Sequence, residues 1–217
     1  MHQRVLITGF EPFGGEAVNP SAQVLAQLAP WRPAGDASLV VQLLPCVFGQ
    51  AIAVLEQALR REQPQLVIAL GQAASRDEVT VERVAINIDD ARIPDNAGAQ
   101  PIDLPVVPGG PAAYFSSLPI KAIVVALQQA GIPASVSQTA GTFVCNHVFY
   151  GLAHALATRH TGVRGGFIHL PCLPQQTAAL GPRPGMPLVT MVQAVQIAVQ
   201  VSLRTSVDLR TGGGTID

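Results

Sequence analysis

Residues 139–147 of the chain are Thr-Ala-Gly-Thr-Phe-Val-Cys-Asn-His, and this segment decides the fold interpretation. A short apolar stretch, 132–136, precedes it, and an apolar pattern with helical spacing follows it from Val148 to Leu156. This order predicts a strand, a turn that contains glycine, and a helix whose first turn carries Cys145. A helix N-terminus favours a thiolate and can bind an oxyanion, because it has partial positive charge and unpaired N–H groups. Cys145 is therefore a candidate nucleophile; the alternative is a small buried core residue.

Strand-like and helix-like patterns alternate along the rest of the chain. Asn19 and Pro20 are typical of a helix start, since Asn caps a helix and Pro fits its first position. The expected strands are residues 5–9, 39–44, 66–70, 79–88, 132–136 and 166–170. One expected helix starts at Pro20, and four others cover residues 51–61, 120–129, 145–158 and 188–203. This alternation predicts an α/β fold with parallel strand pairs and helices on both faces of the sheet.

Length and composition indicate one globular domain. The chain has 217 residues, of which 48% are hydrophobic and 12% charged, so a disordered protein is excluded. We expect one domain over residues 1–210 and a disordered glycine-rich tail over 211–217. The loops 89–113 and 171–187 are long enough to be functional. The net charge of −1 and the lack of a basic cluster argue against nucleic acid or an anionic membrane as a partner.

The cysteines and the ends of the chain favour a soluble, cytoplasmic protein. Three cysteines cannot form a closed set of disulfides, and their spacing matches no zinc motif, so no metal is expected. The N-terminus has no signal-peptide pattern. The longest apolar stretch, 188–203, is interrupted by three glutamines and predicts no membrane span. Its apolar residues surround the helix, which predicts burial between layers or cover by another subunit.

A base and an acid for a thiol nucleophile can be proposed from position alone. His169 lies at the carboxyl end of an apolar strand, where sites of α/β folds gather, although a structural role is the more common one. Glu82 shares a face of the expected strand with Val84 and Ile86, and an ionised carboxylate on such a face needs a partner. The alternative is an edge strand with a solvated Glu82. Cys145, His169 and Glu82 would supply nucleophile, base and orienting acid.

A glycine-rich segment, 6–15, follows the first expected strand. It contains neither Gly-x-Gly-x-x-Gly nor the end of a P-loop, so nucleotide binding is disfavoured. Phe10 and Phe13 either anchor this loop in the core or form the wall of an apolar pocket. No Gly-x-Ser-x-Gly motif occurs, which gives a serine hydrolase of that type no support.

Several segments together closely resemble the cytosolic pyroglutamyl peptidases, also called pyrrolidone carboxyl peptidases. The matching segments are 8–15, Asn19-Pro-Ser21, 82–87, 91–96, 141–146 and 168–171. They occur in order over nearly the whole chain. The resemblance implies a single-domain α/β/α sandwich with a mixed, largely parallel sheet. It also implies a cysteine exopeptidase that releases N-terminal pyroglutamate through a thioester, without a cofactor, as a homo-oligomer with a tetramer favoured.

The resemblance also implies the roles of site residues. It assigns catalysis to Glu82, Cys145 and His169, the same three residues, and oxyanion stabilisation to Arg92 and the Cys145 N–H. The remaining residues that it places at the substrate are Phe10, Phe13, Asn19, Cys46, Gln72, Ile93, Phe143 and Val144. Cys46 stands where a threonine is familiar in the family, and Cys172 where an aromatic residue is common.

Two rival functions remain open at this point. A glutaminase-type amidotransferase also uses Cys, His and Glu, but its Glu usually follows the histidine by two residues, where this chain has Pro171. A non-catalytic binder of a small ligand could retain the pocket. The three intact catalytic residue types argue against this second alternative.

Overall fold

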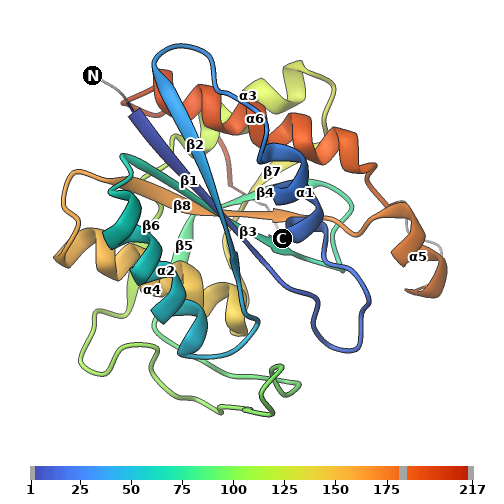
Figure 1. Cartoon of the computed structure of the whole chain (residues 1–217), viewed down its shortest axis with the longest axis vertical. Helices are drawn as coiled ribbons and strands as arrows, with labels where there is room; N and C mark the ends of the chain where they lie inside the picture. The colour runs from blue at the N-terminus through green and yellow to red at the C-terminus, as the bar shows by residue number, and fades with distance from the viewer. Residues whose placement is uncertain (1–2, 181–184, 215–217) are drawn as a thin grey trace.

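The centre of the molecule is a six-stranded sheet with the strand order β2-β1-β3-β8-β4-β7 (Figure 1). The computed structural model describes residues 3–180 and 185–214. Neighbouring strands are parallel except β8 and β4, which are antiparallel. The strands are β1 (Gln3–Phe10), β2 (Ala37–Leu44), β3 (Leu66–Gln72), β4 (Val79–Glu82), β7 (Ala134–Ser137) and β8 (Arg164–Leu170). The α/β fold class and the mixed, largely parallel sheet are therefore confirmed.

Helices cover both faces of this sheet, because its buried strands present apolar side chains on both sides. In β1, Val5 and Ile7 join the core under α1, α3 and α6, whereas Leu6 joins the core under α2 and α4. Figure 1 shows these two helical layers with the sheet between them. The helices are α1 (Pro20–Leu28), α2 (Gln50–Glu62), α3 (Ile120–Gln129), α4 (Val144–Thr158), α5 (Pro174–Leu180) and α6 (Leu188–Arg204).

The expected strand 79–88 is in fact two strands that belong to different sheets. β4 ends at Glu82, and β5 (Val84–Ile86) pairs with β6 (Ala113–Phe115) in a separate two-stranded sheet. Arg83 separates them, because its N–H donates to the Ser137 carbonyl and its own carbonyl accepts from Ser116. The predicted shared face of Glu82 and Val84 is therefore wrong. Glu82 lies on the α2–α4 side, since its neighbour Val81 is in the other core.

Two expected loops contain short elements that the sequence pattern did not indicate. β6 starts at the last residue of the loop 89–113, and α5 lies within the loop 171–187. The first residues of the tail that was predicted to be disordered make contacts: Lys121 donates to the Thr211 carbonyl, and Arg83 donates to the Gly213 carbonyl at 3.0 Å. Residues 215–217 lie outside the described residues.

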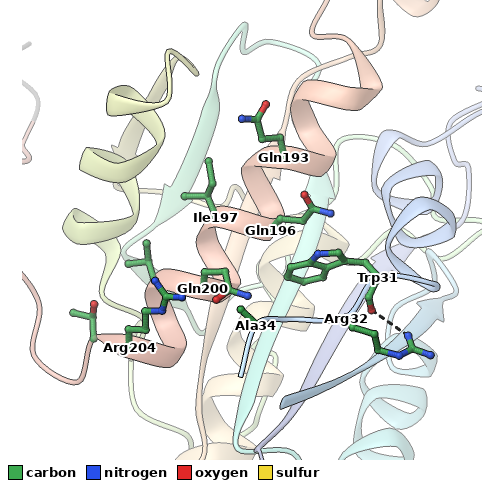
Figure 2. A pocket seen from close by; sticks show the side chains of 10 residues that line it. Trp31, Arg32, Ala34, Gln193, Gln196, Ile197, Gln200 and Arg204 are labelled. Carbon is green, nitrogen blue, oxygen red and sulfur yellow. Dashed lines mark hydrogen bonds between the residues drawn. The ribbon is translucent and has the colours of Figure 1, made fainter. Parts of the chain in front are cut away.

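Helix α6 is covered mainly by its own chain. Met191, Val195 and Val199 are buried against the sheet and its neighbouring helices. Its outer side borders a groove of about 580 Å³ whose lining includes Trp31 and Ile197 (Figure 2). None of the helices in the described ranges is long and apolar enough to cross a membrane.

Candidate active site

The structure brings Glu82 and His169 into direct contact. Both lie on adjacent antiparallel strands, β4 and β8, and Nδ1 of His169 is 2.7 Å from Oε1 of Glu82. Glu82 is completely buried and His169 is 4% exposed. A carboxylate can only accept, so the imidazole proton is on Nδ1 and Nε2 keeps its lone pair. No described residue forms a hydrogen bond with that Nε2, which leaves it available as a base.

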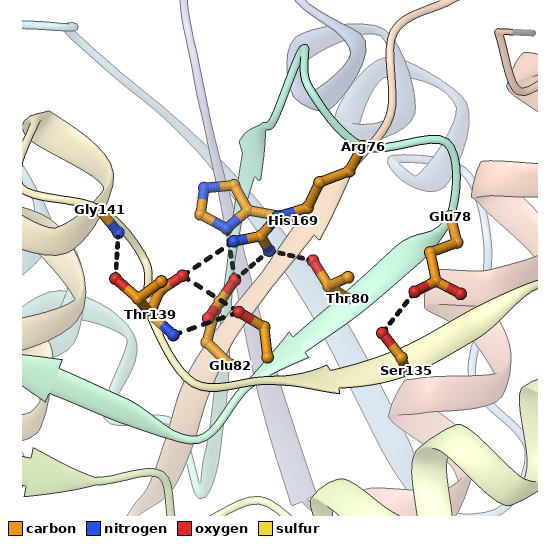
Figure 3. Close-up of polar contacts among 9 residues, drawn as sticks. Arg76, Glu78, Thr80, Glu82, Ser135, Thr139, Gly141 and His169 are labelled. Carbon is orange, nitrogen blue, oxygen red and sulfur yellow. Dashed lines mark hydrogen bonds and ion pairs between the residues drawn. The ribbon is translucent and has the colours of Figure 1, made fainter. Parts of the chain in front are cut away.

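Arg76 is a third member of this cluster, and sequence analysis missed it. It lies in the loop between β3 and β4. One of its terminal nitrogens is 2.6 Å from Oε1 of Glu82 and also donates to Thr80, while the other donates to the Thr139 carbonyl at 2.8 Å (Figure 3). An arginine in a short polar loop has no local sequence signal that distinguishes it from a solvated one. The guanidinium neutralises and holds a carboxylate that burial would otherwise penalise.

These contacts fix the charge states of the acid and the base. Burial by itself would raise the pKa of Glu82, but the hydrogen bond and charge of His169, together with Ser137 and Arg76, lower that pKa below its usual value. Burial lowers the pKa of His169, against the opposing influence of Glu82 and with a further lowering by Arg76. At neutral pH the pair is therefore an ionised carboxylate and a neutral imidazole.

Cys145 lies on the same face of the sheet as His169. Its Sγ is so close to Gly71 that a Cβ added to this glycine would lie 2.8 Å from the sulfur. Gly71 is the register partner of His169 in the parallel pair β3–β8, and partners in a sheet present their side chains to the same face. The glycine thus provides the space in which the thiol approaches the strand of the base.

The expectation that Cys145 has a lowered pKa is wrong. Burial raises the pKa of this thiol, and the neighbouring Cys46 and Glu82 raise it further, while Arg76 lowers it. Loss of water is the largest cause of this shift in pKa. The resting pair is therefore a neutral thiol and a neutral imidazole, so attack by Cys145 would require a base such as His169 to remove the thiol proton.

The start of α4 offers backbone donors for an oxyanion. The helix begins at Val144, and Phe143 provides no side-chain cap. His147 N–H donates to the Phe143 carbonyl, whereas the N–H groups that precede it have no carbonyl four residues earlier in the helix. The predicted second donor, Arg92, has an exposed side chain, and its guanidinium makes no hydrogen bond or ion pair with the described residues.

Aromatic rings from separate loops meet in front of this helix. The Phe143 ring is 5.9 Å from that of Phe13 and 5.4 Å from that of Phe48, measured between centroids. Phe48 was not predicted. Phe10 is 2% exposed, and its ring centroid lies 6.4 Å from that of Phe167 in the core. It therefore anchors the loop after β1 to the core. The two phenylalanines of the N-terminal loop therefore have different surroundings.

The remaining predicted apolar residues flank the rings. Ile93 is half-buried, and its Cδ1 would lie 3.7 Å from a Cβ on Gly14, so the loop after β1 touches the loop 89–113. Val144 is fully buried in the core under α4.

The predicted polar residues show different degrees of internal bonding. Both ends of the Asn19 amide form hydrogen bonds within the fold: its oxygen caps α1 at Ser21, and its nitrogen donates to the Glu11 carbonyl. Gln72 donates from Nε2 to Cys172 Sγ at 3.3 Å, but its buried Oε1 has no partner among the described residues. Cys46 is 2% exposed, and burial, with Glu11 and Asp95, raises the pKa of its thiol to about 12.

In the described ranges, no group of three or more His, Cys, Asp or Glu side chains is placed to hold a metal ion. The site that the residues do form consists of a thiol, an oriented imidazole, backbone donors and an aromatic wall. This set can perform acyl transfer through a covalent intermediate.

Comparisons with known proteins agree with this chemistry. The family described as "Pyroglutamyl peptidase" matches residues 3–205. The chain is 60% identical to the pyrrolidone-carboxylate peptidase of Klebsiella pneumoniae (strain 342) over 210 residues, which is 97% of each chain. It is 52% identical to that of Yersinia pestis (strain Pestoides F), with 99% of each chain covered.

The chain is also similar to solved structures. Pyroglutamyl peptidase I from Bacillus amyloliquefaciens superposes with a TM-score of 0.93 at 47% identity, over 98% of this chain and 100% of that one. A mutant pyrrolidone carboxyl peptidase from Pyrococcus furiosus gives 0.91 at 42% identity, over 94% and 100% of the two chains.

Proposed function

The chain belongs to the pyroglutamyl peptidase family of cysteine peptidases, and from this premise we propose that Cys145, His169 and Glu82 remove N-terminal pyroglutamate from peptides. The observation that carries the assignment is the buried Glu82–His169 pair, which lies on the same face of the sheet as the Cys145 thiol. The nucleophile lies in α4, the base in β8 and the orienting acid in β4, so a helix or a strand fixes the backbone of each residue.

The pocket suits a neutral lactam ring. Pyroglutamate has no free α-amine, so its site needs no carboxylate to bind an ammonium group. The rings of Phe13 and Phe143 provide a flat apolar wall. Oε1 of Gln72 has no partner in the part of the chain that the structure describes. It can accept the lactam N–H, and this bond would satisfy a buried acceptor that otherwise costs roughly 1–3 kcal/mol.

Acylation begins with proton transfer from Cys145 Sγ to Nε2 of His169. The sulfur attacks the carbonyl carbon that links pyroglutamate to the next residue, and the carbonyl oxygen becomes an oxyanion. The Cys145 N–H and Arg92 are the proposed donors to this oxyanion, and one such donor contributes roughly 3–4 kcal/mol in other acyl-transfer enzymes. The C–N bond then breaks, and His169 gives its proton to the departing amine.

Deacylation uses the same residues in reverse. Water attacks the thioester carbon while Nε2 of His169 takes one of its protons. The C–S bond breaks, pyroglutamic acid leaves, and the proton returns to the sulfur of Cys145. Glu82 keeps Nδ1 protonated throughout and stabilises the imidazolium that forms twice in the cycle.

Turnover of a pyroglutamyl aminomethylcoumarin tests this function. We expect fluorescence release by the wild-type protein and none from free glutamine, which also distinguishes the enzyme from a glutaminase. Cys145→Ala should lower kcat by about 10⁴-fold or more. Circular dichroism would establish that this variant is folded. Wild-type-like turnover by folded Cys145→Ala protein would refute the mechanism.

A homo-oligomer and a cytoplasmic location are part of the proposal. The exposed Val189 on α6, together with Trp31 and Ile197 in the groove, gives apolar area that a second copy could cover. Cys46 and Cys145 are free thiols, which suits a reducing compartment. Light scattering at micromolar concentration and cell fractionation test the two points. A strict monomer, or recovery outside the cytoplasm, would contradict them.

A further inference from the structure

His147 forms a second histidine–carboxylate pair, which the catalytic assignment does not use. It is 5% exposed in the first turn of α4, and its Nδ1 lies 2.8 Å from Oδ2 of Asp89. Its Nε2 accepts the Gly49 N–H at 2.9 Å. A backbone amide can only donate, so Nε2 carries no proton and Nδ1 carries the one that goes to Asp89. The imidazole is therefore held neutral with both nitrogens occupied.

One partner of His147 belongs to the segment that leads to the predicted oxyanion donor. Asp89 is joined to Leu104 by two backbone hydrogen bonds, and the next residue, Asp90, exchanges two bonds with Thr142, just before α4. Arg92 and Ile93 follow directly. The position of this segment relative to α4 thus depends partly on the Asp89–His147 contact.

The other partner belongs to the turn that carries Cys46. Gly49 ends this turn at the start of α2, and its φ of 71° is in the region that favours glycine. The neighbouring Phe48 ring packs edge-on against both His147, at 5.2 Å, and Phe143, at 5.4 Å. His147 therefore also lies behind the aromatic wall.

We propose that His147 is a positioning residue, which in its neutral Nδ1–H form holds the 46–49 turn and the 89–93 segment against the first turn of α4. It touches no reacting atom, because α4 directs Cys145 toward Gly71 and His147 toward Asp89 and Gly49. This inference rests on the proposed function, since these segments form the two sides of the pyroglutamyl pocket. His147 determines how tightly the ring is held, and His169 performs the proton transfer.

Three substitutions separate the two hydrogen bonds. His147→Asn keeps a donor near Nδ1 for Asp89 and loses the acceptor for Gly49. His147→Gln keeps an acceptor near Nε2 and loses the donor. His147→Phe keeps the ring and loses both bonds. The matched control is His154→Gln, on the same helix, where Nδ1 bonds to the Tyr114 hydroxyl and not to Asp89 or Gly49.

Steady-state kinetics with the pyroglutamyl coumarin substrate are the main measurement. We expect His147→Phe to raise KM by roughly tenfold or more, because the buried Asp89 carboxylate and the Gly49 N–H both lose their partner, and to change kcat by less. The Asn and Gln variants should fall between it and wild type, and His154→Gln should equal wild type. An unchanged KM in the folded variants, or a loss confined to kcat, would overturn the inference. If the Phe variant does not fold, the other two decide.

Two further readouts do not depend on turnover. In ¹⁵N NMR spectra of the wild-type protein, His147 should show a protonated Nδ1 and an unprotonated Nε2; the opposite tautomer would refute the proposed contact with Gly49. The bare ring, 2-pyrrolidone, should protect Cys145 from iodoacetamide more weakly in the His147 variants, and equal protection would contradict the positioning role. A wild-type protein without turnover would instead refute the proposed function, and both readouts would still test His147.

Discussion

The two buried histidine–carboxylate pairs have almost the same hydrogen bond and very different surroundings. Nδ1 lies 2.7 Å from the carboxylate in His169–Glu82 and 2.8 Å in His147–Asp89. The difference is at Nε2, which accepts the Gly49 N–H in His147 and has no partner among the described residues in His169. An imidazole can exchange a proton only through a free nitrogen. The two pairs therefore differ in function because Nε2 is free in His169 and bonded in His147, and not because of the hydrogen bond to the carboxylate.

The largest effect should come from neutralising each carboxylate in turn. Glu82→Gln should lower kcat by roughly 10⁴-fold, because the amide no longer enforces the Nδ1–H tautomer of His169 or stabilises its imidazolium. Asp89→Asn should mainly raise KM. Stopped-flow and steady-state assays on both variants measure the separate effects on kcat and KM. Equal losses of kcat in the two variants would abolish the distinction between the pairs.

A second experiment separates the thiol from the catalytic pair and leaves both pairs intact. Gly71→Ala adds a Cβ 2.8 Å from Cys145 Sγ and 2.7 Å from the buried Phe167 ring, so the sulfur or the strand must move. A misplacement of this kind should lower kcat by about 100-fold. The control is Gly212→Ala, where nothing lies within 4 Å of the added carbon. Full activity of folded Gly71→Ala protein would show that the thiol does not depend on this space.

Arg76 offers a smaller and more specific test, because it contacts Glu82 and has no counterpart at Asp89 in the described contacts. Arg76 lowers the pKa of His169, so Arg76→Gln should raise that pKa and move the acid limb of kcat/KM to higher pH. We expect a loss of roughly tenfold or less in kcat at neutral pH. The exposed Arg60→Gln variant is the control. An unshifted limb would mean that Arg76 has only a structural role.

The smallest effect concerns stability in acid. The folded-state pKa of His169 is below its ordinary value of 6.5, and that of Glu82 is below 4.5, so in both cases the unfolded chain binds a proton first. Stability should therefore fall as the pH drops through 6.5 and then 4.5, by about 1.4 kcal/mol for each unit of pKa difference. Thermal unfolding between pH 7.5 and 4 measures this. Glu82→Gln should flatten the lower part of the curve, and an identical curve would contradict the assignment.

Much of this site could be predicted from the sequence, because its catalytic groups lie at the ends of periodic elements. The apolar runs before His169 and after Cys145 locate β8 and α4 to within a few residues. The boundary of β4 could not be found in this way, since the break at Arg83 depends on backbone partners at Ser116 and Ser137, more than thirty residues away.

Side-chain partners that come from distant loops could not be predicted from the sequence either. Arg76 and Phe48 act through contacts with Glu82 and Phe143, and no local pattern marks either residue. The two-residue spacing of His147 from Cys145 on a helix indicates that the two side chains diverge. It could not reveal that His147 meets Asp89 and Gly49. The pKa of Cys145 was predicted in the wrong direction, because the sequence shows the helix start but not the burial.

The last strand of the sheet to be synthesised is also one of its central strands. β8 lies between β3 and β4, and residues 164–170 must insert between them before either can pair on that side. A ribosome-bound chain that ends before this point already contains Cys145 but lacks the imidazole that activates it. Its β3 and β4 edges are also open to incorrect pairing. With the proposed roles of Cys145 and His169, chain order therefore delays activity until β8 has been made and inserted into the sheet.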